Sequence, residues 1–309
     1  MRVIFMGTGQ IARASLDRLI HHAGIDVVAV ITQPDRPKGR RLHMAASPVK
    51  TFAEEKGVRV LAPEKVGADA SVQDIEHLRP DLIVVAEYAQ YIKPAILKIP
   101  PLEAINVHPS LLPRYRGAAP IQMAIAQGEA LTGVSIIYVS KEMDAGDVII
   151  QRTVPIGDED TTETLAPRLA EVGAALLVEA VELLREGTAP RLSQDPDLAT
   201  YVAKLTKEDG RIDWSLPARV IRNRVRGFTP WPGSHCEAPR GRGLKVHRVR
   251  IEPGAGEPGT VLEGGKEGPK VATGEDALRL LDVQPEGKAR MSGGAYLSGY
   301  RIGVGDQLG

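Results

Sequence analysis

The chain has 309 residues, 43% hydrophobic and 25% charged, a composition that excludes a mainly disordered protein and leaves room for two domains. Its 39 basic and 39 acidic side chains balance, and its single cysteine, Cys236, excludes an internal disulfide or a cysteine zinc cluster and favours a reducing, cytoplasmic setting. It has no apolar run of about 18 residues and no leader pattern, so we expect neither a membrane span nor export.

Short, unbroken apolar runs recur through the first half of the chain. They cover residues 3–6, 27–31 and 82–86, and segments with helical patterns separate them. Such runs are typical of parallel strands that are buried on both faces. The sequence therefore predicts an α/β fold with a Rossmann-like, doubly wound N-terminal domain.

A glycine-rich loop follows the first of these strands. Gly7-Thr-Gly9-Gln-Ile-Ala12 matches the G-x-G-x-x-A pattern, in which a helix N-terminus holds the phosphates of a dinucleotide. The acid expected at the end of the second strand is absent, because Thr32-Gln33-Pro34 stands there. A tight turn without a cofactor and an NAD(P) site therefore remain alternatives at this point.

The segment from Thr32 to Lys50 is a basic loop in which Pro34, Pro37 and Gly39 prevent a helix. Its cations could bind phosphates; they are Arg36, Lys38, Arg40, Arg41 and Lys50.

The end of this loop carries a complete helix signal. Ser47 can cap a helix, Pro48 suits its first turn, and Gly57 can end it. We expect the next strand at residues 58–61.

Two polar residues occupy alternate positions at the end of a later strand, in Ala104-Ile-Asn-Val-His-Pro-Ser-Leu-Leu-Pro113. The period of two places Asn106 and His108 on one face, at the carboxyl edge where ligands of open α/β sheets bind. Pro109 and Pro113 would stiffen the loop that leaves this edge.

Two further strands are expected at residues 133–140 and 147–156, joined by a turn in which Gly146 permits unusual dihedral angles. The turn contains Asp144, and spacing alone does not bring this acid to His108. A helix from Thr162 to Glu186 follows, and then the interrupted stretch 187–199 predicts a linker.

The remainder of the chain differs in charge and pattern. Residues 201–250 hold twelve Lys/Arg against four Asp/Glu, which indicates a second basic surface. We expect the nearby aromatic residues Trp214, Phe228 and Trp231 to pack in a core rather than stack on bases. From Leu244 onward, short β-prone runs alternate with Gly/Pro turns, which predicts a small antiparallel barrel.

The segment from Asn106 to Pro120, together with Met143-Asp-Ala-Gly-Asp147, resembles the formyltetrahydrofolate-dependent formyltransferases. This resemblance implies that Asn106, His108 and Asp144 converge as catalytic residues. It also implies a cosubstrate, 10-formyltetrahydrofolate, and no metal. The residues that it assigns to folate are Ser110, Leu111, Leu112, Pro113, Tyr88 and Ala89.

Several members of that family share this N-terminal half, so these motifs leave the acceptor open. Thr32-Gln-Pro-Asp-Arg-Pro37, Arg211-Ile-Asp-Trp214 and Pro230-Trp-Pro-Gly233 resemble the branch whose acceptor is initiator methionyl-tRNA. Ser47-Pro-Val-Lys50 and Gln284-Pro-Glu-Gly-Lys288 add to that likeness.

The branch implies a catalytic domain at 1–188, a linker at 189–204 and an OB-like tRNA-binding domain at 205–309. Its product would be N-formylmethionyl-tRNA for translation initiation. No membrane and no obligate protein partner is expected. The candidate tRNA contacts are Arg36, Lys38, Arg40, Arg41, Arg222 and Arg226, with Arg40 assigned to the acceptor stem.

Two places depart from the family pattern. The family usually has proline at Gly9 and an aromatic residue at Ile11, positions associated with the methionyl pocket. Glu87-Tyr88-Ala89 stands where alanine-tyrosine-glycine is common, near the folate site. Neither departure affects the three catalytic candidates.

The chemistry implied is attack of an α-amine on the formyl carbon, with Asn106 and protonated His108 donating hydrogen bonds to the developing oxyanion. Asp144 would keep His108 charged and help relay the proton from the amine to the leaving nitrogen. Two functions of other classes remain alternatives: an NAD(P)-dependent oxidoreductase, and a tRNA-binding module without catalysis.

Overall fold

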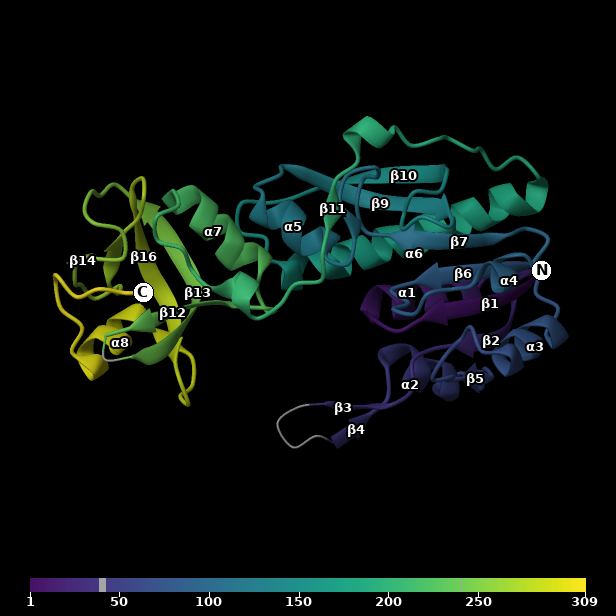
Figure 1. The fold of residues 1–309 in the computed structure, drawn as a ribbon, viewed down its shortest axis with the longest axis horizontal. Helices are drawn as coiled ribbons and strands as arrows, with labels where there is room; N and C mark the ends of the chain where they lie inside the picture. Colours follow the sequence, from purple (N-terminus) through teal and green to yellow (C-terminus); the bar gives the residue numbers. More distant parts are fainter. Residues whose placement is uncertain (39–42, 240) are drawn as a thin grey trace. The chain divides into compact units, whose positions relative to one another are not determined.

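A computed structural model of the chain describes residues 1–38, 43–239 and 241–309 (Figure 1). The chain divides into two compact units. Unit 1 consists of Met1–Gly117, Thr132–Pro155 and Ala166–Tyr201, and unit 2 consists of Ala118–Leu131, Ile156–Leu165 and Val202–Gly309.

Unit 1 is built on a seven-stranded sheet with the order β10-β9-β7-β6-β1-β2-β5. The order reverses direction at β1; the strands from β7 to β5 pair in parallel, and β9 joins β7 antiparallel. The α/β prediction is therefore confirmed. The strands are β1 (Arg2–Gly7), β2 (Asp26–Ile31), β5 (Val60–Leu61), β6 (Leu82–Ala86), β7 (Ala104–His108), β9 (Leu131–Tyr138) and β10 (Val148–Pro155).

Helices cover both faces of this sheet, because its strands are apolar on both sides. One face packs Ile4, Met6 and Ile83 against Ile75 of α3 and Ile96 of α4. On the other face, α6 lies close to β7 and β9. The helices are α1 (Gln10–Ile20), α2 (Pro48–Glu55), α3 (Asp69–His77), α4 (Pro94–Leu97) and α6 (Thr162–Glu186).

The predicted start and end of α2 are confirmed. The Ser47 hydroxyl accepts a hydrogen bond from the Lys50 backbone N–H, Pro48 opens the helix and Gly57 has a positive φ of 70°. The basic loop before it contains a hairpin that the sequence did not predict, β3 (Arg36–Lys38) and β4 (His43–Ala45). Such short strands carry too little apolar pattern to be recognised from sequence.

Unit 2 contains an antiparallel sheet with the order β12-β13-β16-β15-β14, and β17 pairs with β16. This confirms the expected C-terminal antiparallel β domain. Its strands are β12 (Ser234–Ala238), β13 (Arg242–Glu252), β14 (Val261–Glu263), β15 (Lys270–Ala272), β16 (Ala277–Pro285) and β17 (Met291–Ser292). Its helices are α5 (Pro120–Ala126), α7 (Ala218–Gly227) and α8 (Gly293–Tyr300).

The three aromatic residues of the basic segment do not share one environment. Trp214 and Phe228 are buried in unit 2, as predicted. The prediction for Trp231 is wrong, because 55% of its surface is exposed. The peptide bonds before Pro230 and Pro232, on either side of Trp231, are both cis.

Among the residues that the structure describes, no helix is long and apolar enough to cross a membrane.

Candidate active site

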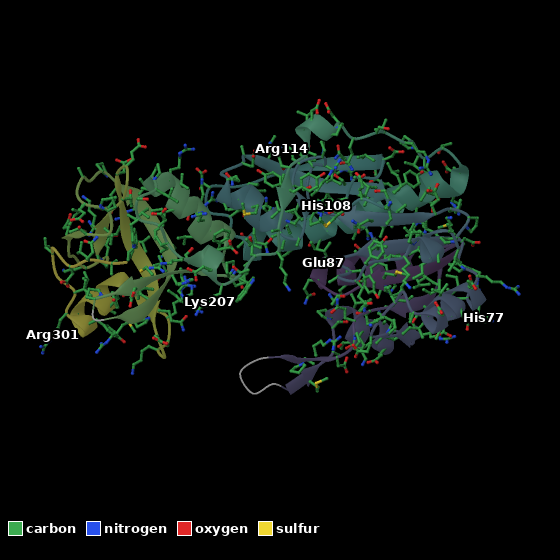
Figure 2. All side chains as sticks on the ribbon, viewed as in Figure 1. His77, Glu87, His108, Arg114, Lys207 and Arg301 are labelled. Atoms are coloured by element: carbon green, nitrogen blue, oxygen red, sulfur yellow. The ribbon has the colours of Figure 1, made fainter. Side chains whose placement is uncertain are left out.

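Asn106 and His108 lie on one face of β7, as the alternation predicts. Register places Asn106 beside Ile137 of β9 and beside Val85 of β6. His108 is buried, with 4% of its surface exposed, and Asn106 is half-buried. The sheet therefore fixes two polar side chains at the carboxyl end of β7, and Figure 2 labels one of them, His108.

Asp144 reaches the same face from the turn between β9 and β10. Its Oδ2 lies 3.6 Å from His108 Nδ1, and its Oδ1 lies 3.4 Å from Asn106 Nδ2. Oδ2 also accepts a hydrogen bond of 2.8 Å from the Gly117 backbone N–H. The three residues that family resemblance brought together are thus in contact within unit 1.

The turn reaches this position through a strained backbone. Asp144 itself has φ of 52°, in the left-handed region that costs a non-glycine residue about 1 kcal/mol or more. The expectation that Gly146 supplies the unusual dihedral angles is wrong. Gly146 is needed for space instead, because a Cβ there would lie 1.8 Å from the Tyr138 carbonyl oxygen.

The hydrogen bond of His108 shows which ring nitrogen carries a proton. Its Nε2 lies 3.0 Å from the Tyr115 carbonyl oxygen, which can only accept, so Nε2 carries a proton. Nδ1 faces the Asp144 carboxylate, whose Oδ2 lies 3.6 Å away. Asn106 Nδ2 has a second N–H, for which the described part of the chain offers no acceptor.

The segment predicted as a linker contributes directly to this site. We name residues 188–201 the crossing segment. Gln194 Nε2 donates to the carbonyl oxygens of Asp144, at 2.8 Å, and of Gly146, at 2.7 Å. Gln194 Oε1 accepts two hydrogen bonds from the buried Arg116 guanidinium. Gln194 therefore holds the strained turn.

The same segment also holds the loop after β7. The Thr200 hydroxyl accepts a hydrogen bond of 2.7 Å from the Tyr115 backbone N–H, and the Thr200 carbonyl accepts one from Arg116. Tyr115 has φ of 61° and presents its carbonyl to His108. Sequence reasoning missed these residues because a polar residue in an interrupted, proline-containing stretch carries no periodic signal.

The folate candidates leave neighbouring parallel strands at the same edge of the sheet. Tyr88 and Ala89 follow β6, and the stretch Ser110 to Pro113 follows β7. Ser110 is fully buried, where its hydroxyl donates to the Arg114 carbonyl. Leu112 packs against Ile137 and Val148.

Within this group, Tyr88 lies partly in the core. Its ring packs against the apolar cluster beneath β6, and burial raises the pKa of its hydroxyl to about 12. Ala89 is exposed.

The glycine-rich loop after β1 is closed by Glu87, the residue that directly follows β6. The Glu87 carboxylate accepts hydrogen bonds from the backbone N–H groups of Ile11, at 2.9 Å, and Ala12, at 3.1 Å. These are the donors of the α1 N-terminus that a dinucleotide phosphate would use. The alternative of an NAD(P) site therefore loses its main structural basis.

The tRNA candidates of the basic loop are only partly described. Arg36 is exposed and pairs with Glu64 at 2.7 Å. The backbone of Lys38 belongs to β3, but its side chain lies outside the described residues, as do Arg40 and Arg41 altogether.

The two candidates on α7 have partners inside unit 2. Arg222 pairs with Glu159 at 2.6 Å, and Arg226 donates to the carbonyl oxygens of Gly157 and Asp160. Burial, with the neighbouring charge of Arg222, lowers the pKa of the Arg226 guanidinium. Both side chains hold the residues 156–165 against α7.

The residues that the structure describes contain no group of three or more His, Cys, Asp or Glu side chains that could hold a metal ion. The polar groups of the site are amide, imidazole, carboxylate and backbone groups. Such a set can bind a carbonyl oxygen and move a proton.

Comparison with known proteins finds family matches and relatives along almost the whole chain. Residues 1–181 match the formyl transferase family, and residues 204–301 match the formyl transferase C-terminal domain. A methionyl-tRNA formyltransferase of Geotalea daltonii is 45% identical over 309 residues, which cover 100% of this chain and 98% of the relative. The methionyl-tRNA formyltransferase of Moorella thermoacetica is 44% identical, with 100% and 99% covered.

Among solved structures, the sugar 3N-formyl transferase WlaRD has a TM-score of 0.66 at 18% identity and covers 94% of this chain and 99% of its own. HypX from Aquifex aeolicus, solved with tetrahydrofolic acid, has a TM-score of 0.63 at 21% identity and covers 98% of this chain and 48% of its own. At these identities the likeness establishes the fold alone.

Proposed function

Because this chain belongs to the methionyl-tRNA formyltransferase family, within the formyl transferases, we propose that it transfers the formyl group of 10-formyltetrahydrofolate to the α-amine of initiator methionyl-tRNA. The product is N-formylmethionyl-tRNA for translation initiation. The reaction takes place in the cytoplasm and needs no metal and no obligate protein partner. The contact of Asn106, His108 and Asp144 on one face of β7 is the observation that carries this proposal.

The amine of the aminoacyl group attacks the formyl carbon, and the carbonyl oxygen becomes an oxyanion. The second N–H of Asn106 is the donor already available to this oxygen. His108 donates when one of its ring N–H groups turns from its present partner to the substrate. The oxyanion then collapses to a carbonyl, the bond between the formyl carbon and N10 breaks, and N10 takes the proton that the amine loses.

Asp144 serves as the partner of the His108 ring throughout. Its carboxylate stabilises the imidazolium, and its bond from Gly117 keeps it oriented. Folate is held by the edge formed by residues 88–89 and 110–113. This assignment is supported by their common position after β6 and β7.

Transfer RNA contacts are assigned to the two basic segments. The first comprises Arg36, Lys38, Arg40 and Arg41, with Arg40 directed to the acceptor stem. Arg222 and Arg226 remain in the proposal as part of the second, although their partners inside unit 2 reduce the charge that they present. We place the domain boundaries at 1–188, 189–204 and 205–309, as the resemblance to the methionyl-tRNA branch implies.

The test is a formylation assay with purified protein, 10-formyltetrahydrofolate and one of three acceptors: charged initiator tRNA, charged elongator tRNA, or free methionine. We expect formyl incorporation into initiator methionyl-tRNA well above the other two. Incorporation into free methionine at an equal rate would contradict the tRNA assignment. Binding of tRNA without any incorporation would support a binding module instead.

Salt provides an independent measure of the tRNA assignment. Affinity for tRNA should fall steeply as salt rises, because phosphate contacts release counterions. Folate affinity should change little over the same range. A salt-insensitive tRNA affinity would contradict the assignment of the basic segments.

A further inference from the structure

Glu87 lies at the point where the strand order of the sheet reverses. It follows β6 directly, and β6 and β1 are neighbours whose registered pairs end at Gly7 and Ala86. Ligands of open α/β sheets bind in the crevice at such a reversal, outside the carboxyl ends of the strands. Residue 87 is therefore placed where a bound ligand would meet both strands (Figure 2).

The carboxylate of Glu87 fills the anion position at the N-terminus of α1. Its Oε2 accepts hydrogen bonds from the N–H groups of Ile11 and Ala12. The N-cap residue, Gly9, has no side chain that could do so. A phosphate at this helix would need the same two donors and would meet a carboxylate of like charge.

Gly9 and Glu87 form one structural feature. A Cβ at position 9 would lie 2.3 Å from Glu87 Oε2 and 2.6 Å from its Cδ, so a side chain at residue 9 and the bound carboxylate exclude each other. Glu87 reaches this place with φ of 48°, a strained value for glutamate. Both departures from the family pattern noted in the sequence thus concern one contact.

We propose that Glu87 determines acceptor specificity, by occupying the phosphate position of α1 and so excluding small amines that carry a phosphate close to the amine. In an aminoacyl-tRNA, an acyl group and a ribose separate the amine from the nearest phosphate, so this acceptor class is unaffected. This inference rests on the proposed function, because it states which class of acceptor the formyl-transfer site excludes.

Burial of the carboxylate agrees with this role. The residue as a whole is exposed at the edge of the sheet, but its carboxyl end is lodged against the backbone of residues 9–12. Burial raises the pKa of Glu87, and the hydrogen bonds from Ala12 and Ile11 lower it in part. The group is thus held without full hydration, where a second anion is repelled more strongly than in water.

The test measures binding of O-phosphoethanolamine, a small amine with a phosphate, to the full-length protein by calorimetric titration. Glu87→Ala removes both the charge and the occupying group, and Glu87→Gln removes the charge but keeps the volume. Glu76→Ala is the matched control, because it makes the same change in net charge at an exposed position of α3.

We expect Glu87→Ala to bind the probe at least about tenfold more tightly than the wild type, and Glu87→Gln to lie between them. Glu76→Ala should match the wild type. O-Phosphoethanolamine should then inhibit formylation of methionyl-tRNA most strongly in the Glu87→Ala variant, and not in the wild type or in Glu76→Ala. Equal affinities for the probe in all four proteins would overturn the inference.

Formylation by the wild type is measured on the same preparations, so the two ideas are tested separately. A wild type that formylates methionyl-tRNA, with equal probe affinities in every variant, contradicts only the role of Glu87. A wild type that does not formylate methionyl-tRNA overturns the proposed function and the acceptor inference with it.

Discussion

Two polar corners of unit 1 lie at the carboxyl edge of the same sheet but are built in opposite ways. Around β7, the side chains of Asn106, His108 and Asp144 pair with one another, yet an amide N–H stays available. At the start of α1, the Glu87 carboxylate takes the backbone donors that the helix offers. The first, formed by Asn106, His108 and Asp144, is the open corner, because it keeps a donor for a carbonyl oxygen. The second, formed by Glu87 and the start of α1, is the closed corner, because a carboxylate already occupies the place of an anion.

A sequence motif by itself does not reveal whether its hydrogen-bond donors are free. The glycine-rich loop has the spacing of a phosphate site, but an acid 75 residues later in the chain occupies it. The Asn106 motif has only two polar residues in a strand, but segments distant in sequence complete it. In both corners a partner from elsewhere in the chain decides the chemistry.

The largest expected effect comes from removing a group of the open corner. Asn106→Ala and Asp144→Asn should each reduce kcat by about 10² to 10³, or 3 to 4 kcal/mol, because each removes a group that supports the oxyanion. Single-turnover formylation of methionyl-tRNA measures this. Near-full turnover in either variant, with an unchanged melting temperature, would remove that residue from the proposed mechanism.

The closed corner predicts a coupling between Gly9 and Glu87. Gly9→Ala should lower the free energy of unfolding by about 1 to 2 kcal/mol, because the new Cβ displaces the carboxylate from its two N–H donors. The same substitution should cost clearly less in a Glu87→Ala background. Urea denaturation of the four proteins of this cycle gives the coupling energy.

Gly299→Ala is the control for that cycle, because a Cβ there meets nothing within 4 Å in α8. It should be neutral or stabilising by up to about 1 kcal/mol. Additive effects of the Gly9 and Glu87 substitutions would mean that the two residues do not exclude each other.

A smaller effect should follow from loosening the open corner without touching its reactive groups. Gln194→Ala removes two hydrogen bonds to the carbonyls of the strained turn, each worth about 1 kcal/mol, and should lower kcat about tenfold. Gln194→Glu keeps the acceptor for Arg116 but loses these donors, so it should resemble Gln194→Ala.

The split between kinetic constants identifies the role of Gln194. A positioning residue for Asp144 should change kcat with little change in the KM for folate. A fall in thermal stability alone, with kcat unchanged, would show that the crossing segment only supports the fold.

The smallest effect is a pH dependence of stability from the closed corner. The folded pKa of Glu87 lies above its ordinary value of 4.5, so the folded chain retains a proton over a range in which the unfolded chain has lost it. Its contribution is fully present below about pH 4.5 and is lost as pH rises through the folded pKa.

Wild-type stability relative to Glu87→Gln should therefore decline across that range. The slope is below about 1.4 kcal/mol per pH unit, and partial exposure reduces it further. Urea midpoints of both proteins from pH 4 to pH 7 provide the measurement. A constant difference would show that the carboxylate titrates alike in the folded and unfolded chains.

Local signals in the sequence determined much of the architecture. The apolar runs predicted β1, β2 and β6, and the Ser47, Pro48 and Gly57 signals predicted where α2 begins and which glycine follows its end. The alternation in β7 placed Asn106 and His108 on one face. Each of these rests on periodicity or capping within a few residues, which is information that a sequence carries directly.

Tertiary structure decided what those elements meet. Whether Asp144 reaches His108, whether Gln194 holds the turn, and whether Glu87 fills the α1 N-terminus depend on contacts 36 to 76 residues apart in the chain. Such contacts follow from strand order and from close backbone approach at Gly9 and Gly146. The spacing of apolar residues reports neither strand order nor close backbone approach. The open and closed corners are therefore distinguished only by the tertiary structure.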